Sequence, residues 1–79
     1  MSKEPRTKLG QRLRAARQVA GLTQDALARL SGVHRTYIGA LERGEKEPTL
    51  FVLVRLAGAL GVDPGALVTG IRPDDADRE

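Results

Sequence analysis

The most constraining feature of this chain is the stretch QDALARLSGVHRTYIGALER, residues 24–43, which holds two short helical patterns. The first pattern places Leu27 and Ala28 on one side, and the second places Ile38 and Leu41 three residues apart on one face. Gly32 lies between them, and glycine readily adopts the left-handed conformation that a helix C-terminus requires. The stretch therefore predicts two short helices that cross steeply and are joined by a tight turn.

The flanking sequence predicts three more helices. A regular apolar stripe indicates a first helix over about residues 7–20, with Thr7 as its N-cap. Thr49 is expected to cap a fourth helix that ends near Gly61. Asp63-Pro64 is a strong start signal for a fifth, because aspartate caps and proline suits the first helical position. The sequence thus predicts an all-α, five-helix fold.

The expected domain organisation is simple. Residues 1–6 are polar and are predicted to form a flexible N-terminal arm, residues 7–71 a single folded domain, and residues 72–79 an acidic disordered tail. The tail holds four acidic residues and two arginines, so the preceding part keeps eleven basic and six acidic residues, a net charge of +5. Such a charge suits a polyanionic partner, although an ordinary solvated surface could also carry it.

The composition excludes several classes of function. The absence of cysteine and the single histidine argue against a disulfide framework, a zinc cluster or a multi-histidine metal site. Two aromatic residues cannot form a stacking platform for single-stranded nucleic acid. No apolar run approaches a membrane span, and the N-terminus lacks the apolar region of a secretory signal, so a cytoplasmic protein without membrane contact is expected.

Residues 21–50 resemble the helix-turn-helix of the Cro/CI-type, Xre-like repressors of bacteria and phages. The residues that carry this resemblance are Leu22-Thr23-Gln24, Leu27-Ala28, Gly32-Val33, Ile38, Leu41-Glu42-Arg43-Gly44 and Pro48. The match extends over about residues 9–67, and within the family Arg35-Thr36-Tyr37 is similar to the controller proteins of restriction-modification systems. The resemblance implies a lambda-repressor-like DNA-binding domain whose third helix enters the major groove of double-stranded DNA.

The third helix supplies the predicted base contacts. At 100° per residue, Ile38 and Leu41 face the core together with His34, and the opposite side carries small residues that let the backbone approach base edges. Arg35 is the best candidate for reading a base, because its planar fork can donate two hydrogen bonds to guanine. The residues predicted to contact bases are Arg35, Thr36 and Ala40.

Contacts with the DNA backbone are predicted for Gln24, His34, Tyr37, Arg43 and Lys46. Gln24 follows the N-cap Thr23, and its amide can donate to a phosphate oxygen beside the positive helix N-terminus. Asp25 is expected to complement the helix dipole instead. Two alternatives stay open: the Tyr37 ring could shield the core, and His34 could act only as an N-cap.

The resemblance also implies a structural ion pair. In related repressors, an arginine at the position of Arg17 pairs with a glutamate at the position of Glu42, which ties the first helix to the end of the third. The alternative is that Arg17 is a solvated surface residue.

Apolar residues in the last two helices exceed what a single small core requires. They predict a homodimer interface made of Phe51, Val52, Leu60, Val62, Leu67, Val68 and Ile71. The alternative is that they complete the core of a monomer. In the resembling family a homodimer binds a palindromic operator whose half-sites lie roughly 34 Å apart.

The predicted function is sequence-specific binding of double-stranded DNA to regulate transcription, by blocking RNA polymerase or by contacting and recruiting it. No nucleophile with a base, carboxylate pair or phosphate-binding loop is evident, so neither an enzyme nor a cofactor is expected. One alternative is an antitoxin that binds DNA and also neutralises a partner protein. Another is a protein-interaction module that has lost DNA binding.

Overall fold

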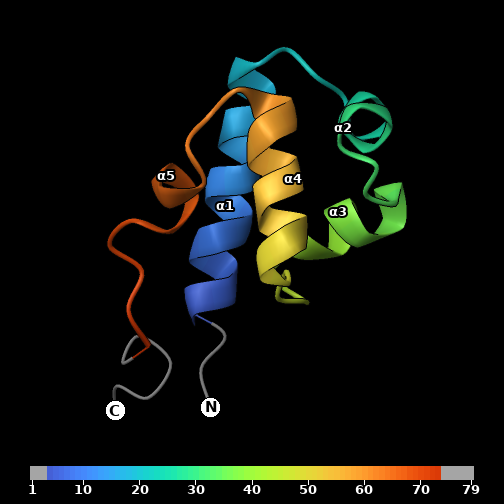
Figure 1. Cartoon of the computed structure of the whole chain (residues 1–79). Helices are drawn as coiled ribbons and strands as arrows, with labels where there is room; N and C mark the ends of the chain where they lie inside the picture. Colours follow the sequence, from blue (N-terminus) through green and yellow to red (C-terminus); the bar gives the residue numbers. More distant parts are fainter. Residues whose placement is uncertain (1–3, 74–79) are drawn as a thin grey trace.

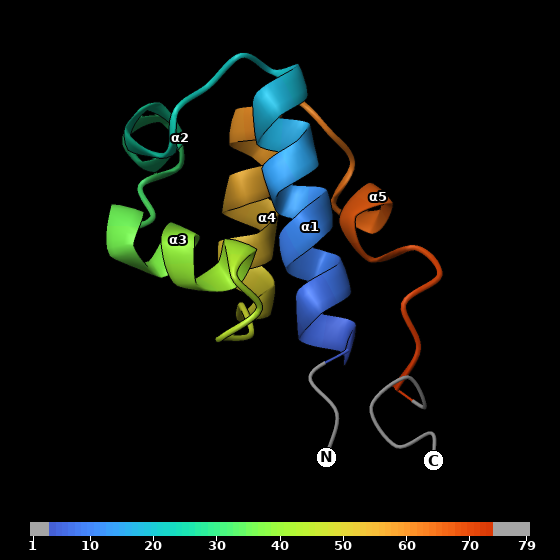
Figure 2. The ribbon, with the colours of Figure 1, turned by 180° about the vertical axis from the view of Figure 1, so that it is seen from behind.

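This computed structural model describes residues 4–73 of the chain, which contain five α-helices. They are α1 (Glu4–Val19), α2 (Gln24–Ser31), α3 (Arg35–Glu42), α4 (Leu50–Leu60) and α5 (Pro64–Val68). α3 packs on α1 and α2, α2 packs on α4, and α5 packs on α1 and α4. As Figures 1 and 2 show, α2 and α3 lie on one side of α1 and α4, and α5 lies on the other. The predicted all-α, five-helix architecture is confirmed.

Three of the N-caps that the sequence predicts are formed in the structure. The hydroxyl oxygen of Thr23 accepts a hydrogen bond from the Ala26 amide at 3.0 Å, and that of Thr49 accepts one from Val52 at 3.2 Å. The Asp63 carboxylate caps α5 in the same way, accepting from the Gly65 amide at 3.2 Å. Each contact satisfies an amide that has no partner within its helix, which fixes where these helices begin.

The start of α1 differs from the prediction. The helix begins at Glu4, so Thr7 lies inside it and does not cap it, and residues 4–6 are not a flexible arm. Pro5 causes no break because a proline in the first turn removes an amide that would have no helical partner there. Arg6 faces the chain before α4, with its Nε 3.4 Å from the Glu47 carboxylate. The other residues of the predicted arm, 1–3, and residues 74–79 of the predicted tail lie outside the described residues.

The core is built from one apolar face of each of the first four helices and from the turn between α2 and α3. Its buried side chains are Leu13, Leu27, Val33, Ile38, Leu41, Leu56 and Leu60. α1 comes unusually close to the end of α3 at Gly10, where an added Cβ would lie only 2.7 Å from the backbone oxygen of Glu42. This close packing fixes the height and tilt of α3 against the rest of the molecule.

The predicted division between core and dimer surface needs correction. Leu60 is 9% exposed and Leu67 is 2% exposed, so both belong to the interior of a single chain and are not available to a partner. Phe51, by contrast, is 79% exposed, and Leu50 beside it is 72% exposed. In the last two helices, the surplus apolar surface therefore lies mainly on the outer face of α4, and α5 adds Val68, which is 40% exposed.

Membrane-spanning helices are absent from residues 4–73, where none of the helices combines the length and apolar character that crossing a bilayer requires.

Candidate nucleic-acid interface

The turn between α2 and α3 has the geometry that the sequence predicts. Gly32 adopts φ = 74°, the left-handed conformation, and its amide donates to the carbonyl of Ala28 to close α2. Val33 then enters the core at 6% exposure, and Ile38 and Leu41 hold the inner side of α3 with 0% and 1% exposure. The inner side of α3 is therefore fixed in the core, while its N-terminal end is exposed to solvent.

His34 begins α3 as its N-cap. Its ring Nδ1 accepts a hydrogen bond from the Thr36 amide at 3.1 Å, and the ring is exposed rather than directed into the core as the helical periodicity suggested. The cap leaves Nε2 as the ring atom that could meet a phosphate. Arg35 and Thr36 follow at once and are both exposed.

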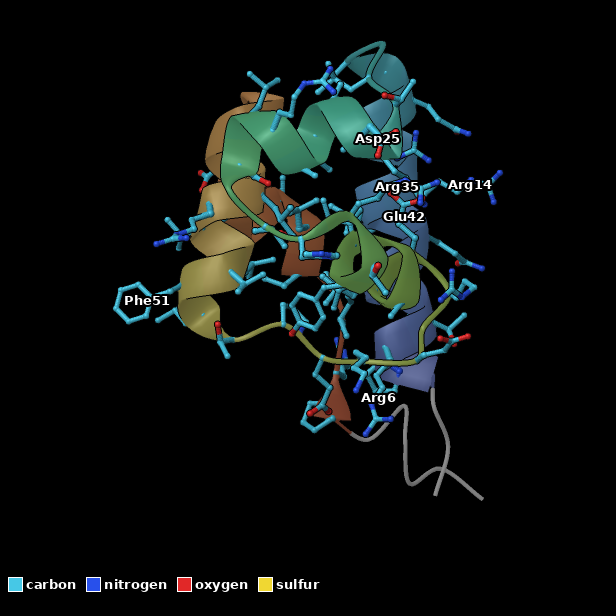
Figure 3. All side chains as sticks on the ribbon, turned by 90° about the vertical axis from the view of Figure 1, so that its right-hand side faces the viewer. Arg6, Arg14, Asp25, Arg35, Glu42 and Phe51 are labelled. Atoms are coloured by element: carbon cyan, nitrogen blue, oxygen red, sulfur yellow. The ribbon has the colours of Figure 1, made fainter. Side chains whose placement is uncertain are left out.

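Arg35 does not extend freely into solvent. Its Nε lies 2.9 Å from Oδ1 of Asp25 in the first turn of α2, and the two side chains are 59% and 64% exposed (Figure 3). Asp25 is thus a residue of the candidate interface that the sequence interpretation missed. Local spacing could not reveal it, because the contact depends on how α2 and α3 cross.

A second arginine of the interface is also paired. Arg43, just after α3, donates two hydrogen bonds to the Glu45 carboxylate at 2.9 and 3.1 Å. These hydrogen bonds and the negative charge of Glu45 raise the pKa of Arg43 above its ordinary value. Gly39 leaves room for this arrangement, since a Cβ there would lie 3.1 Å from the Arg43 Nη1 atom. Lys46 is exposed in the following loop.

Two residues predicted to contact DNA are instead packed within the protein. Ala40 is 7% exposed, so the predicted base contact by its methyl group is wrong. The Ala40 carbonyl accepts a hydrogen bond from the Glu45 amide at 2.9 Å as part of the C-cap of α3, where Gly44 is left-handed with φ = 75°. Tyr37 packs against the core and donates its hydroxyl hydrogen to the Glu47 carbonyl at 2.8 Å, so the core-shielding alternative holds in place of the phosphate contact.

The structure brings Arg17 and Glu42 together, as the resemblance implies. Arg17 donates from Nε to Glu42 Oε2 at 2.7 Å and from Nη2 to Oε1 at 3.0 Å, with the two side chains only 13% and 4% exposed. The hydrogen bond to Glu42 is the main cause that raises the pKa of the Arg17 guanidinium, against the opposite effect of burial. Arg17 also donates to the carbonyl of Leu22 at 2.9 Å, so one side chain joins α1, the turn before α2 and the end of α3.

Gln24 belongs to this same network. Its Nε2 donates to Glu42 Oε1 at 3.1 Å, which links the first residue of α2 to the last residue of α3. The sequence assigned Gln24 only to the DNA backbone, whereas here it first helps to fix the angle between the two helices. A carboxamide carries two donor hydrogens, so a phosphate contact through the second one stays a prediction.

Taken together, these contacts place an exposed helix end, which bears Arg35 and Thr36, on a rigid helical support. This arrangement defines a helix-turn-helix protein of the kind that presents one helix to a nucleic-acid groove. The helix-turn-helix family model matches residues 13–67, and the chain belongs to this Xre-like family of transcriptional regulators.

Individual relatives are similar over most of the chain. The control protein C.SmaI of Serratia marcescens is 44% identical over 61 residues, which span 77% of this chain and 73% of the relative. The control protein C.BamHI of Bacillus amyloliquefaciens is 35% identical over 69 residues, spanning 86% of this chain and 85% of the relative. The crystal structure of the restriction-modification controller protein C.AhdI from Aeromonas hydrophila matches with a TM-score of 0.77 and 45% identity, covering 78% of this chain and 94% of that one.

Proposed function

We propose that this protein is a sequence-specific regulator of transcription that binds a palindromic operator as a homodimer, with α3 in the major groove. The observation that carries the proposal is the exposed start of α3, where Arg35 and Thr36 project from a helix whose opposite side is locked into the core. A helix held in this way can enter the groove without losing the packing that positions it. The names of the relatives favour control of restriction-modification genes as the setting.

Each exposed residue of the interface has a distinct role in this proposal. Arg35 reads a guanine through its two-pronged donor group, and Thr36 offers its hydroxyl or methyl group to the neighbouring base. Four further residues hold the phosphate backbone and set the register: Gln24, His34, Arg43 and Lys46. Tyr37 acts indirectly, because its hydrogen bond to Glu47 fixes the loop that carries Lys46.

A titration with labelled duplex DNA at increasing salt concentration tests the proposal. Binding through phosphate contacts releases counterions, so the logarithm of the affinity should fall linearly with the logarithm of salt, with a slope of about −0.9 for each phosphate contacted. An affinity that does not change with salt would exclude DNA binding of this kind. Selecting bound duplexes from a random pool would then give the operator sequence.

Replacing Arg35 by alanine is expected to weaken binding to the selected operator by about 1–3 kcal/mol and to relax the preference at one base position. Replacing Arg43 by alanine should weaken binding to every duplex alike, because a phosphate contact carries no sequence information. Affinities of the two variants for the operator and for single-base variants of it distinguish these roles. An equal loss on all sequences for Arg35→Ala would make Arg35 a backbone contact.

The homodimer part of the proposal uses the exposed apolar face of α4. Phe51 projects away from the bundle (Figure 3), and Leu50 and Val54, 72% and 45% exposed, lie on the same outer face of the helix. Val68, 40% exposed, and Ile71 line an open apolar cavity of about 250 Å³ between α5 and the start of α1. Exposed apolar area of this kind is typical of protein interfaces. The proposed interface thus comprises Leu50, Phe51, Val54, Val68 and Ile71, whereas Val52 and Val62, which the sequence placed with them, pack against the core.

Replacing Phe51 by glutamate is expected to shift the protein from dimer to monomer and to weaken operator binding. A negative charge would be desolvated on association, whereas in the monomer it lies in the first turn of α4, where it complements the helix dipole. Sedimentation equilibrium over a range of concentrations measures the change. Val19→Glu is the matched control, since Val19 is 90% exposed at the far end of α1. Equal dimerisation of the two variants would contradict the assignment of Phe51 to the interface.

A further inference from the structure

We propose that Arg14 of α1 is a further phosphate-binding residue of the DNA interface, one that lies outside the helix-turn-helix. The inference rests on the proposed function, because the phosphate that Arg14 binds belongs to the duplex that α3 reads. Arg14 strengthens the hold on any duplex, and the reading of bases is left to α3.

Arg14 is fixed beside the end of α3. Gly10 and Arg17 mark the side of α1 that faces this end, since Gly10 closely approaches the backbone of Glu42 and Arg17 donates to its carboxylate. Arg14 comes four residues after Gly10 and three before Arg17, a spacing that places helix residues on neighbouring positions of one face. The packing that positions α3 therefore also positions the backbone of Arg14.

The Arg14 side chain projects toward the same surroundings as the candidate interface. It is exposed, and Figure 3 shows it extending away from the ribbon at the level of Arg35 and Glu42, on the side where Asp25 marks the start of α2. A duplex that meets the start of α3 and the start of α2 is therefore expected to bring its backbone next to Arg14.

Arg14 differs from the other arginines of this surface because its charge is uncompensated. Arg35 is paired with Asp25 and Arg43 with Glu45, whereas no carboxylate pairs with Arg14 in the described part of the chain. α1 itself carries five basic residues and a single acidic one, at its first position. A phosphate that binds Arg14 thus replaces only water, whereas one that binds Arg43 must also replace a carboxylate.

Exposed polar residues extend this edge of α1 in both directions. They follow one another at intervals of four, three and four residues, which keeps them on one helix face: Thr7, Gln11, Arg14 and Gln18. Each neutral member carries donor hydrogens, and none carries a negative charge that would repel phosphate. This face is suited to lie along a polyanion, with Arg14 as its charged centre.

The test compares Arg14→Ala with Arg12→Ala as its matched control. Arg12 carries the same charge in the same helix, but its Nη2 would lie 3.7 Å from a Cβ on Gly70, just after α5. As Figures 1 and 2 show, α5 lies on the other side of α1 from α3. Alanine has the highest helix propensity, so both substitutions preserve the helix.

Affinities are measured for the selected operator and for a random-sequence duplex of equal length, each at several salt concentrations. Arg14→Ala is expected to weaken binding to both duplexes by the same factor, about five-fold at about 0.15 M salt, and to make the slope of log affinity against log salt less steep by about 0.9. Arg14→Lys should restore most of the affinity, because a phosphate contact requires the charge rather than the planar fork. Arg12→Ala should leave the slope close to that of wild type.

A second measurement locates the contact on the operator. A single methylphosphonate, which removes the charge of one phosphate, is placed at each position in turn. At the phosphate that Arg14 binds, it should weaken binding of wild type but not of Arg14→Ala, because the two changes remove the same interaction. If no position behaves in this way, the inference is overturned.

The remaining outcomes separate the inference from the proposed function. If wild type binds both duplexes and Arg14→Ala behaves like Arg12→Ala, the inference is overturned and the proposed function stands. A loss confined to the operator would also overturn the inference, because Arg14 would then take part in reading a base. Wild type that binds neither duplex would overturn the proposed function itself.

Discussion

Replacing Glu42 by alanine is expected to destabilise the protein by about 3–5 kcal/mol, the range measured when one partner of a buried ion pair is removed. The Glu42 side chain is 4% exposed, and its carboxylate accepts hydrogen bonds from Arg17 and Gln24. Its loss leaves the Arg17 guanidinium buried at 13% exposure, with the Leu22 carbonyl as its one remaining hydrogen-bond partner among residues 4–73. A domain of this length is stabilised by about 4–12 kcal/mol, so much of that margin would be lost.

Urea unfolding of four proteins measures this effect: wild type, Arg17→Ala, Glu42→Ala and the double variant. Since removing both partners leaves no buried charge unpaired, the double variant should be at least about 1 kcal/mol more stable than the sum of the single effects predicts. Glu47→Ala is the control, because Glu47 is 70% exposed in its contact with Arg6 and its loss should cost no more than about 1 kcal/mol. Purely additive losses at Arg17 and Glu42 would contradict a coupled pair.

The parts of the fold that follow from short-range chemistry were predictable from the sequence. Thr23, Thr49 and Asp63 cap helices because a side-chain oxygen can reach an amide two or three residues ahead, and no tertiary contact is needed. Gly32 ends α2 for an equally local reason, its left-handed backbone. The start of α1 was missed because Pro5 was interpreted as part of a flexible arm, although proline is tolerated in a first helical turn.

The candidate site was predictable only in part, because its details depend on tertiary packing. A helical wheel assumes that one side of a helix is buried, and by that rule Ala40 faces outward. α3 packs against both α1 and α2, so more than one side of this short helix is covered. Asp25 was missed for the same reason, since its contact with Arg35 exists only once α2 and α3 cross.

The sequence alone also cannot separate core residues from interface residues in the last two helices. Leucines at helical spacing are compatible with a core position and with an interface position. Hydrophobicity alone does not indicate which side of a helix another element will cover. α5 packs on α1 and α4 and buries Leu67, and α4 turns Leu60 inward, while Phe51 is left outside. Only the relative placement of the helices separates these residues.

Gly10 shows how a residue without functional chemistry can control the site. A Cβ at this position would lie 2.7 Å from the backbone oxygen of Glu42 and 2.9 Å from its carbonyl carbon. Backbone atoms cannot move aside by changing rotamer, so α1 and the end of α3 would have to separate. That movement would also strain the hydrogen bonds between Arg17 and Glu42, which join the same two helices.

Replacing Gly10 by alanine is therefore expected to destabilise the protein by about 3 kcal/mol, at the upper end of the usual cost of overpacking. The helical preference of alanine over glycine, worth about 1 kcal/mol at most, acts in the opposite direction but is too small to compensate. Because α3 would also shift, affinity for the operator should fall even at temperatures where the variant remains folded. Thermal unfolding followed by circular dichroism, with duplex binding at low temperature, measures both effects.

Gly58→Ala provides the matched control, because Gly58 is also inside a helix but a Cβ there would meet no atom within 4 Å. The same substitution should then stabilise the protein by about 0.5–1 kcal/mol through helix propensity alone. Since Gly58 lies on the outer face of α4, unfolding is measured at two protein concentrations to separate folding from association. The expected result is a change of opposite sign at the two glycines. A stabilising effect at Gly10 would mean that α1 and α3 are not held by this close approach, and that the position of α3 is set by the ion pair alone.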